Sequence, residues 1–225
     1  MRLIDREESL IHSYLLMRRM IGILAMALPV ILIAGGFLEG GFVVQGSLSA
    51  YYYTNMRDFL VGMLFSVAIF LISYKGYELI DDVVTNLSGF FALGIIAFPT
   101  SMFTGEVVRV GVFQIQDNIS QYYHLVFSVL FLLSLSFNSM FLFTRHGGSP
   151  SREKKIRNGV YVASGLIMLS CVAGMIVYIA FYSHTPLAKE RPVLVFETIA
   201  LISFGVSWLV KGHTIFRDKQ LSSLR

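Results

Sequence analysis

Four side chains could do chemistry within or beside the apolar stretches of this sequence: Arg57, Asp58, His124 and Glu197. Two carboxylates and an imidazole could share a proton, ligate a metal ion or bind a polar headgroup, and the guanidinium could pair with an anionic group. Glu197 is the most informative of the four, because it lies inside an apolar run. A carboxylate that is buried in hydrocarbon without a partner costs about 2–3 kcal/mol or becomes neutral by taking up a proton.

Each of these residues also has a structural interpretation. His124 stands where an apolar run begins, and a histidine there is more often a structural hydrogen bonder than a ligand. Arg57 and Asp58 would be ordinary charges of the lipid headgroup zone, and the nearby tyrosines would form an aromatic belt. For Glu197, a structural hydrogen-bond partner and a functional role are equally consistent with the sequence.

Recognisable catalytic signatures are absent, since the sequence contains no HExxH, CxxC, GxSxG or Walker motif. Only five histidines occur, and only His124 is expected within a membrane. The three-histidine zinc site of the ceramidase and adiponectin-receptor type therefore cannot be built. The single cysteine, Cys171, is expected to be an inert packing residue. We assign no catalytic residue and no metal site, leave any cofactor unknown, and favour a protein that is not an enzyme.

The composition indicates what must position these side chains. The 225 residues are 55% hydrophobic and only 14% charged, with a mean hydropathy of +0.68, whereas a soluble domain carries about 25% charged residues. The sequence therefore predicts a membrane protein. Although the net charge is +4, the basic residues flank apolar runs, as they do in the cytoplasmic loops of membrane proteins. Nucleic acid is not an expected partner.

Six stretches are long and apolar enough to cross a hydrocarbon core of about 30 Å as helices. The expected fold class is all-α, a polytopic bundle of six transmembrane helices at about 18–38, 58–77, 84–104, 122–144, 158–182 and 193–211. Before this bundle (18–211) we expect a cytoplasmic segment, 1–17, either as an amphipathic helix on the inner surface or as a helical extension. After it we expect a cytoplasmic tail, 212–225.

Lysine and arginine residues predict the orientation. With the N-terminus inside, only Arg57, Arg109, Lys189 and Arg191 lie in outer loops, and the remaining 14 of the 18 cationic residues are cytoplasmic. An excess of Lys and Arg marks the cytoplasmic side, so both ends of the chain are expected in the cytoplasm. The basic loop 146–157 is expected to contact anionic lipid headgroups.

This orientation brings polar residues from several segments to the outer side. The hydroxyl-rich loop 46–59 ends at Arg57 and Asp58, and the fourth helix carries a polar stripe that begins at His124 and Ser128. We predict that these groups converge on one ligand-binding pocket, which is formed by Ser47, Ser49, Tyr52, Arg57, Asp58, Thr100, His124, Ser128 and Glu197.

Small and aromatic residues suggest how the helices pack. Gly62 with Ser66 on the second helix, and Ser170 with Gly174 on the fifth, have the small-xxx-small spacing that lets helix backbones approach in a membrane. Trp208 is expected to be an anchor at the membrane interface.

Several strings of this sequence resemble a family of uncharacterised bacterial six-helix inner-membrane proteins. They are SLSAYYYTNMRDFLVG (47–62), YKGY (74–77), NLSGFFALGIIAFPT (86–100) and FGVSWLVKG (204–212). The resemblance covers most of the chain from Arg18 to Gly212. It implies the six-helix fold and a location in the bacterial inner (plasma) membrane, and it implies no activity.

Three functions remain in view. The first is binding of a lipid headgroup or small amphiphile at the outer pocket. The second is an interaction or scaffold subunit without a ligand, which recruits partners through the basic loop and the N-terminal segment. The third is an intramembrane metal-dependent hydrolase or transferase that uses Asp58, His124 and Glu197. Membrane lipids are the expected partners, together with a second copy of the chain or another membrane subunit.

Overall fold

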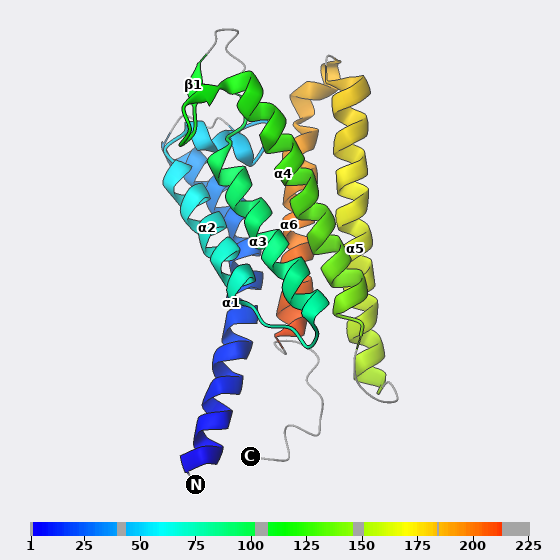
Figure 1. Ribbon diagram of the computed structural model, residues 1–225. Helices are drawn as coiled ribbons and strands as arrows, with labels where there is room; N and C mark the ends of the chain where they lie inside the picture. The colour runs from blue at the N-terminus through cyan, green and yellow to red at the C-terminus, as the bar shows by residue number, and fades with distance from the viewer. Residues whose placement is uncertain (1, 40–43, 102–107, 146–150, 184, 213–225) are drawn as a thin grey trace.

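The computed structural model describes residues 2–39, 44–101, 108–145, 151–183 and 185–212, and the side chains of residues 2–11 lie outside this description. The fold is all-helical, as predicted (Figure 1). Its six α-helices are α1 (Arg2–Glu39), α2 (Arg57–Ser73), α3 (Leu79–Ala97), α4 (Asp117–Phe137), α5 (Arg152–Val177) and α6 (Pro192–Lys211).

Shorter elements extend or connect these helices. Two π-helical turns, η2 (Asn138–Leu142) and η3 (Tyr178–Tyr182), continue α4 and α5. The 3₁₀ turns η1 (Ser49–Tyr53) and η4 (Pro186–Glu190) precede α2 and α6. A small antiparallel pair, β1 (Arg109–Val110) with β2 (Ile115–Gln116), precedes α4. We call the end of the bundle that carries η1, η4 and the β pair the η1 end (Figure 1).

Five of the helical segments are long and apolar enough to cross a membrane: His12–Leu38, Leu79–Ala97, Asp117–Leu142, Arg152–Tyr182 and Pro192–Lys211. The helix α2 is shorter, with 17 residues. It ends at Ser73, before the predicted limit of 77, because Tyr74 adopts an extended conformation with a ψ of 133°.

The third predicted span, 84–104, begins and ends too late in the sequence. The helix α3 begins at Leu79, after a capping box. The Glu78 side chain accepts a hydrogen bond from the Asp81 backbone amide, and the Asp81 side chain accepts one from the Glu78 backbone amide. It ends at Ala97 because Pro99 disfavours the helical conformation at Phe98, whose ψ is 84°. Proline and capping residues therefore set both limits, and hydropathy alone misplaced them.

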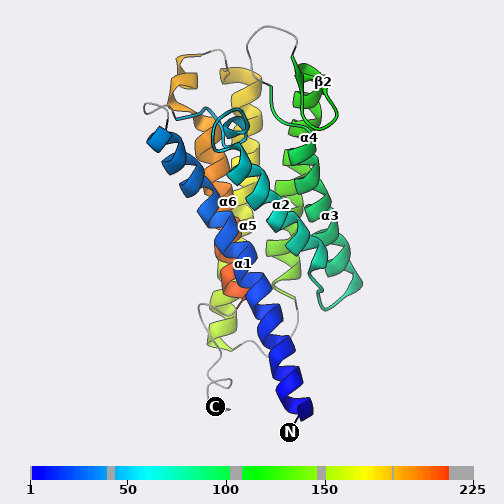
Figure 2. The same ribbon diagram turned by 90° about the vertical axis from the view of Figure 1, so that its left-hand side faces the viewer.

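The predicted segment 1–17 and the first span form one helix. Residues Arg2–Glu39 make up α1 without a break, and the N-terminal half of α1 extends beyond the other helices (Figure 2). Apart from Gly212, the predicted tail 212–225 lies outside the described residues. Of the basic loop 146–157, residues 146–150 also lie outside them, while Arg152 begins α5 and Ser151 caps it by accepting from the Lys154 amide at 3.1 Å.

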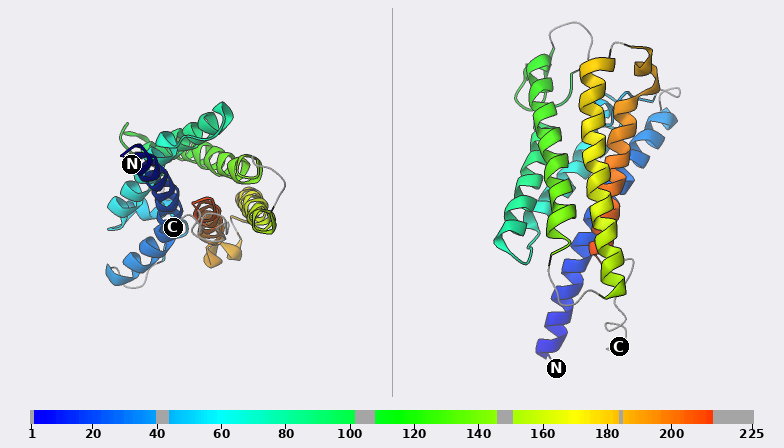
Figure 3. Two further views of the ribbon diagram at one scale, coloured as in Figure 1. Left: turned by 90° about the horizontal axis from the view of Figure 1, so that it is seen from below. Right: turned by 90° about the vertical axis from the view of Figure 1, so that its right-hand side faces the viewer.

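The six helices form a closed ring. Each packs against its neighbours in sequence, and α1 packs against α6 (Figure 3, left). Glycines allow the closing contact: a Cβ added to Gly22 would lie 2.8 Å from the carbonyl oxygen of Gly205, and one added to Gly205 would lie 2.7 Å from that of Gly22. The α1 and α6 backbones therefore touch.

A buried apolar cluster fills the ring away from the η1 end. It includes Leu71, Leu135, Phe204 and Trp208. Trp208 is only 1% exposed and packs edge-on against Tyr74 and Phe143. It is therefore a core residue, and the expectation of an interfacial anchor is wrong.

Candidate functional site

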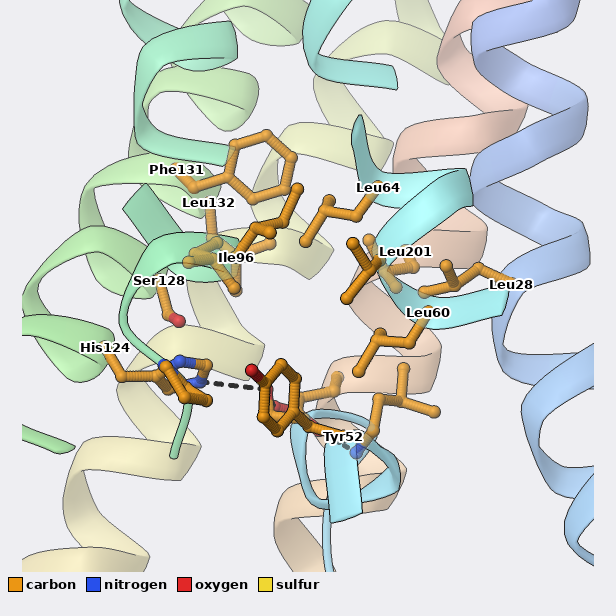
Figure 4. A pocket seen from close by; sticks show the side chains of 16 residues that line it. Leu28, Tyr52, Leu60, Leu64, Ile96, His124, Ser128, Phe131, Leu132 and Leu201 are labelled. Atoms are coloured by element: carbon orange, nitrogen blue, oxygen red, sulfur yellow. Dashed lines mark hydrogen bonds between the residues drawn. The ribbon is translucent and has the colours of Figure 1, made fainter. Parts of the chain in front are cut away.

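A cavity of about 700 Å³, its open mouth included, lies inside the ring near the η1 end. Most of its wall is apolar and comes from different helices: Leu28 from α1, Leu60 from α2, Ile96 from α3, Phe131 from α4 and Leu201 from α6 (Figure 4). Because five helices and η1 all contribute, the cavity is a property of the closed ring.

Polar side chains gather at one end of this wall. Five of the nine predicted pocket residues line the cavity: Ser49, Tyr52, His124, Ser128 and Glu197. They come from η1, α4 and α6, which are far apart in the sequence. The predicted convergence of the η1 segment, His124 and Glu197 on one pocket is therefore seen in the fold.

Glu197 fixes the η1 segment to α6. Its Oε2 accepts a hydrogen bond of 2.5 Å from the Leu48 amide, and its Oε1 lies 3.4 Å from the Ser49 hydroxyl oxygen. One turn earlier, the Leu194 amide donates to the Gly46 carbonyl at 3.1 Å. Glu197 thus has hydrogen-bond partners, as its structural interpretation expected. It also lines the cavity, as a functional role would require.

His124 joins α4 to two other segments. Its Nδ1 lies 2.8 Å from the Phe98 carbonyl oxygen, and its Nε2 lies 2.9 Å from the Ser49 hydroxyl oxygen. A carbonyl oxygen can only accept, so the partners assign the proton of the ring to Nδ1. In the neutral imidazole, Nε2 then accepts from Ser49. Ser49 therefore lies between His124 and Glu197 at the cavity wall, in contact with both.

Arg57 and Asp58 do not line the cavity. Both are exposed in the first turn of α2. At 100° per residue, Asp58 lies 200° from Leu60, which faces the cavity, so the helix turns Asp58 away from it. Arg57 reaches the site only through Tyr52: its guanidinium carbon lies 4.6 Å from the ring centroid, and Nη2 donates to the phenol oxygen at 3.1 Å.

Ser47 and Thr100 support the site from outside the cavity wall. The Ser47 hydroxyl accepts from the Ala50 amide at 3.1 Å and so holds the turn at the start of η1. The Thr100 hydroxyl donates to Gln121 Oε1 at 2.6 Å, and its carbonyl accepts from the Tyr53 phenol at 2.5 Å. Burial raises the pKa of Tyr53 to about 12, so this phenol remains a hydrogen-bond donor at neutral pH.

The apolar lining is the part of the site that sequence reasoning missed. Leu60 and Leu64 line the cavity from one face of α2, and their spacing of four residues was a readable signal. The described ranges contain no group of three or more His, Cys, Asp or Glu side chains that could hold a metal ion.

Comparison with protein-family models, with curated proteins and with solved structures gives no match for this chain.

Proposed function

We propose that this protein crosses a bacterial inner membrane six times, with both ends in the cytoplasm, and binds a small amphiphile in the cavity. Five apolar helices support the membrane location, and the excess of Lys and Arg on one side supports the orientation. The resemblance of the η1 and α6 strings to bacterial inner-membrane proteins supports the choice of membrane.

The sixth span in this proposal is α2. It packs between α1 and α3 in the ring, so it shares the depth of two helices that are long enough to span. Its 17 residues correspond to about 26 Å of helix at 1.5 Å per residue. That length lies at the short end of the range for transmembrane helices, about 17–25 residues.

One observation carries the proposed function: an apolar cavity inside the ring ends on Ser49, His124 and Glu197. Ligand pockets typically have a mostly apolar wall and a few polar groups that fix the orientation of the ligand. An amphiphile would place its tail among the leucines and its polar group at the η1 end. Since no Lys or Arg of the described chain lines the wall, a phosphate headgroup is a poor fit.

Cavity filling tests this proposal on one helix. Leu60 lines the cavity, whereas Gly62 is exposed and has no atom within 4 Å of an added Cβ. We expect Leu60→Trp to lower the binding of 1-lauroylglycerol at least about tenfold, since the indole occupies the ligand's volume. Gly62→Trp should bind like the wild type. Native mass spectrometry during a titration of the purified protein measures the bound fraction.

A second cavity variant guards against a folding defect. Ser128→Leu fills the same space from α4 with an aliphatic side chain. Unchanged 1-lauroylglycerol binding by folded Leu60→Trp and Ser128→Leu proteins contradicts the proposal. So does an equal loss of binding in Gly62→Trp.

The contact between Ser49 and His124 favours a second candidate, an acyl-transfer enzyme. A serine that donates to an oriented imidazole is the arrangement of an activated nucleophile. Ser49 Oγ would attack an ester carbonyl while His124 Nε2 takes its proton and passes it to the leaving alcohol, and water would then release the acyl group. Glu197, 3.4 Å from Ser49, would repel the developing oxyanion, so this candidate ranks second. Covalent labelling by a fluorophosphonate that is lost in Ser49→Ala would establish it.

A further inference from the structure

The wall of the cavity carries one acidic side chain, Glu197, that has no cationic partner among the described residues. Of its lining residues in the described chain, only Glu197 and His124 have side chains that can be charged near neutral pH. Arg57 is exposed and is not a lining residue. Within the same described part of the molecule, no Lys or Arg lies within ion-pair distance of Glu197.

The partners of Glu197 are neutral groups. The backbone amide of Leu48 occupies Oε2 at 2.5 Å. The Ser49 hydroxyl has one proton, and its distances of 2.9 Å to His124 and 3.4 Å to Glu197 assign that proton to His124. The Ser49 amide is a further neutral partner of the carboxyl group, and the Glu197 side chain lines the cavity.

The other groups of the described chain that face Glu197 include no cation. Tyr52 of η1 contributes a neutral phenol, and α1 and α2 contribute leucines. His124 of α4 has both ring nitrogens satisfied as the neutral Nδ1–H form, by Phe98 and Ser49. The cavity is therefore an apolar space with one carboxylate at its polar end.

We infer that the cavity selects amphiphiles that carry one positive charge, such as a protonated or quaternary amine, over neutral and anionic amphiphiles of the same tail length. The inference rests on the proposed function and names its ligand class. A cation near Oε1 of Glu197 would be attracted more strongly than in water, because the apolar wall keeps the local dielectric low.

The test compares three ligands with the same tail and different headgroups: decyltrimethylammonium, 1-decanoylglycerol and decyl sulfate. Equilibrium dialysis against the protein in phosphatidylcholine nanodiscs, with empty nanodiscs as the blank, measures each dissociation constant. We expect the ammonium to bind at least about tenfold more tightly than the glycerol ester, and the sulfate to bind most weakly. Equal binding of the ammonium and the glycerol ester, or tighter binding of the sulfate, overturns the inference.

Variants separate the carboxylate from the remainder of the site. Glu197→Gln keeps the shape and an acceptor for the Leu48 amide but removes the charge, so it should lose the preference for the ammonium and keep the affinity for 1-decanoylglycerol. Glu190→Gln removes an exposed acid just before α6 and should leave the preference unchanged. Retention of the full preference by Glu197→Gln overturns the inference. The wild type distinguishes the two proposals. If it binds none of the three ligands, the proposed function itself fails. If it binds 1-decanoylglycerol as tightly as the ammonium, only the inference about charge fails.

Discussion

The imidazole Nε2 of His124 lies 2.9 Å from the hydroxyl oxygen of Ser49, although the two residues are 75 positions apart. On its other side the same ring reaches the Phe98 carbonyl at the end of α3. One side chain of α4 therefore holds both the η1 segment and the end of α3. Because Ser49 also approaches Glu197, the position of the cavity's polar end depends on this contact.

Replacing His124 should loosen the η1 end. In His124→Phe an apolar ring replaces the imidazole and leaves the Phe98 carbonyl and the Ser49 hydroxyl without their partner. An unsatisfied buried polar group costs about 1–3 kcal/mol, so the apparent midpoint of thermal unfolding should fall by several degrees in detergent. Val126→Ala, on the same helix and exposed, serves as the control. Equal midpoints for His124→Phe and the wild type would show that the bridge contributes no stability.

The glycine contact that closes the ring predicts opposite signs for two similar substitutions. Gly205→Ala places a Cβ 2.7 Å from the Gly22 carbonyl oxygen, so α1 and α6 must separate and the unfolding midpoint should fall. Gly62→Ala adds its Cβ to open space and should stabilise α2 by up to about 1 kcal/mol, the helix propensity difference. Scanning fluorimetry of both variants measures the change, and a Gly205→Ala protein as stable as Gly62→Ala contradicts the closing contact.

Arg18 is predicted to be a structural arginine that lysine cannot replace. It is 2% exposed and donates to the phenols of Tyr14 and Tyr74 and to the Lys211 carbonyl. The ammonium of a lysine cannot span these three acceptors, and hydrogen bonds from charged donors contribute about 1.5–3 kcal/mol each.

We therefore expect Arg18→Lys to reduce the yield of folded protein in gel filtration. Arg19→Lys is the matched control, because among the described residues Arg19 donates to one acceptor, the Gly212 carbonyl. Similar elution profiles for the two variants would mean that the extra contacts of Arg18 are unimportant.

Hydropathy predicted the helices well and their limits less well. The first and sixth predicted spans, 18–38 and 193–211, end close to the observed helix ends at Glu39 and Lys211. The third does not, because Pro99 and the capping box at Glu78 fix α3 through local backbone geometry. A window average of hydropathy cannot detect such local stops.

The polar end of the site was predictable because helical periodicity is reliable over short distances. His124 and Ser128 are four residues apart and do line one cavity. The rotation of α2 relative to η1 was not predictable, because it depends on the turn at Thr54. Arg57 and Asp58 were therefore predicted to face the cavity, which they do not line. The sequence also did not reveal which small residues bring two helices together. Gly62 is exposed, whereas Gly22 and Gly205 meet where α1 contacts α6.

The orientation can be tested with the chain's own cysteine content. Cys171 is buried at 4% exposure and should react little, so single new cysteines report on their own surroundings. Asn55 is exposed in the turn after η1, and Arg152 is exposed at the start of α5.

With the η1 end outside, a membrane-impermeant maleimide should label Asn55→Cys in intact spheroplasts and Arg152→Cys only after lysis. Wild-type protein provides the background from Cys171. The reverse pattern would place the cavity's polar end toward the cytoplasm. The distribution of Lys and Arg would then have predicted the wrong orientation. The amphiphile would still meet the same carboxyl group, because the ring and its cavity do not depend on which side of the membrane they face.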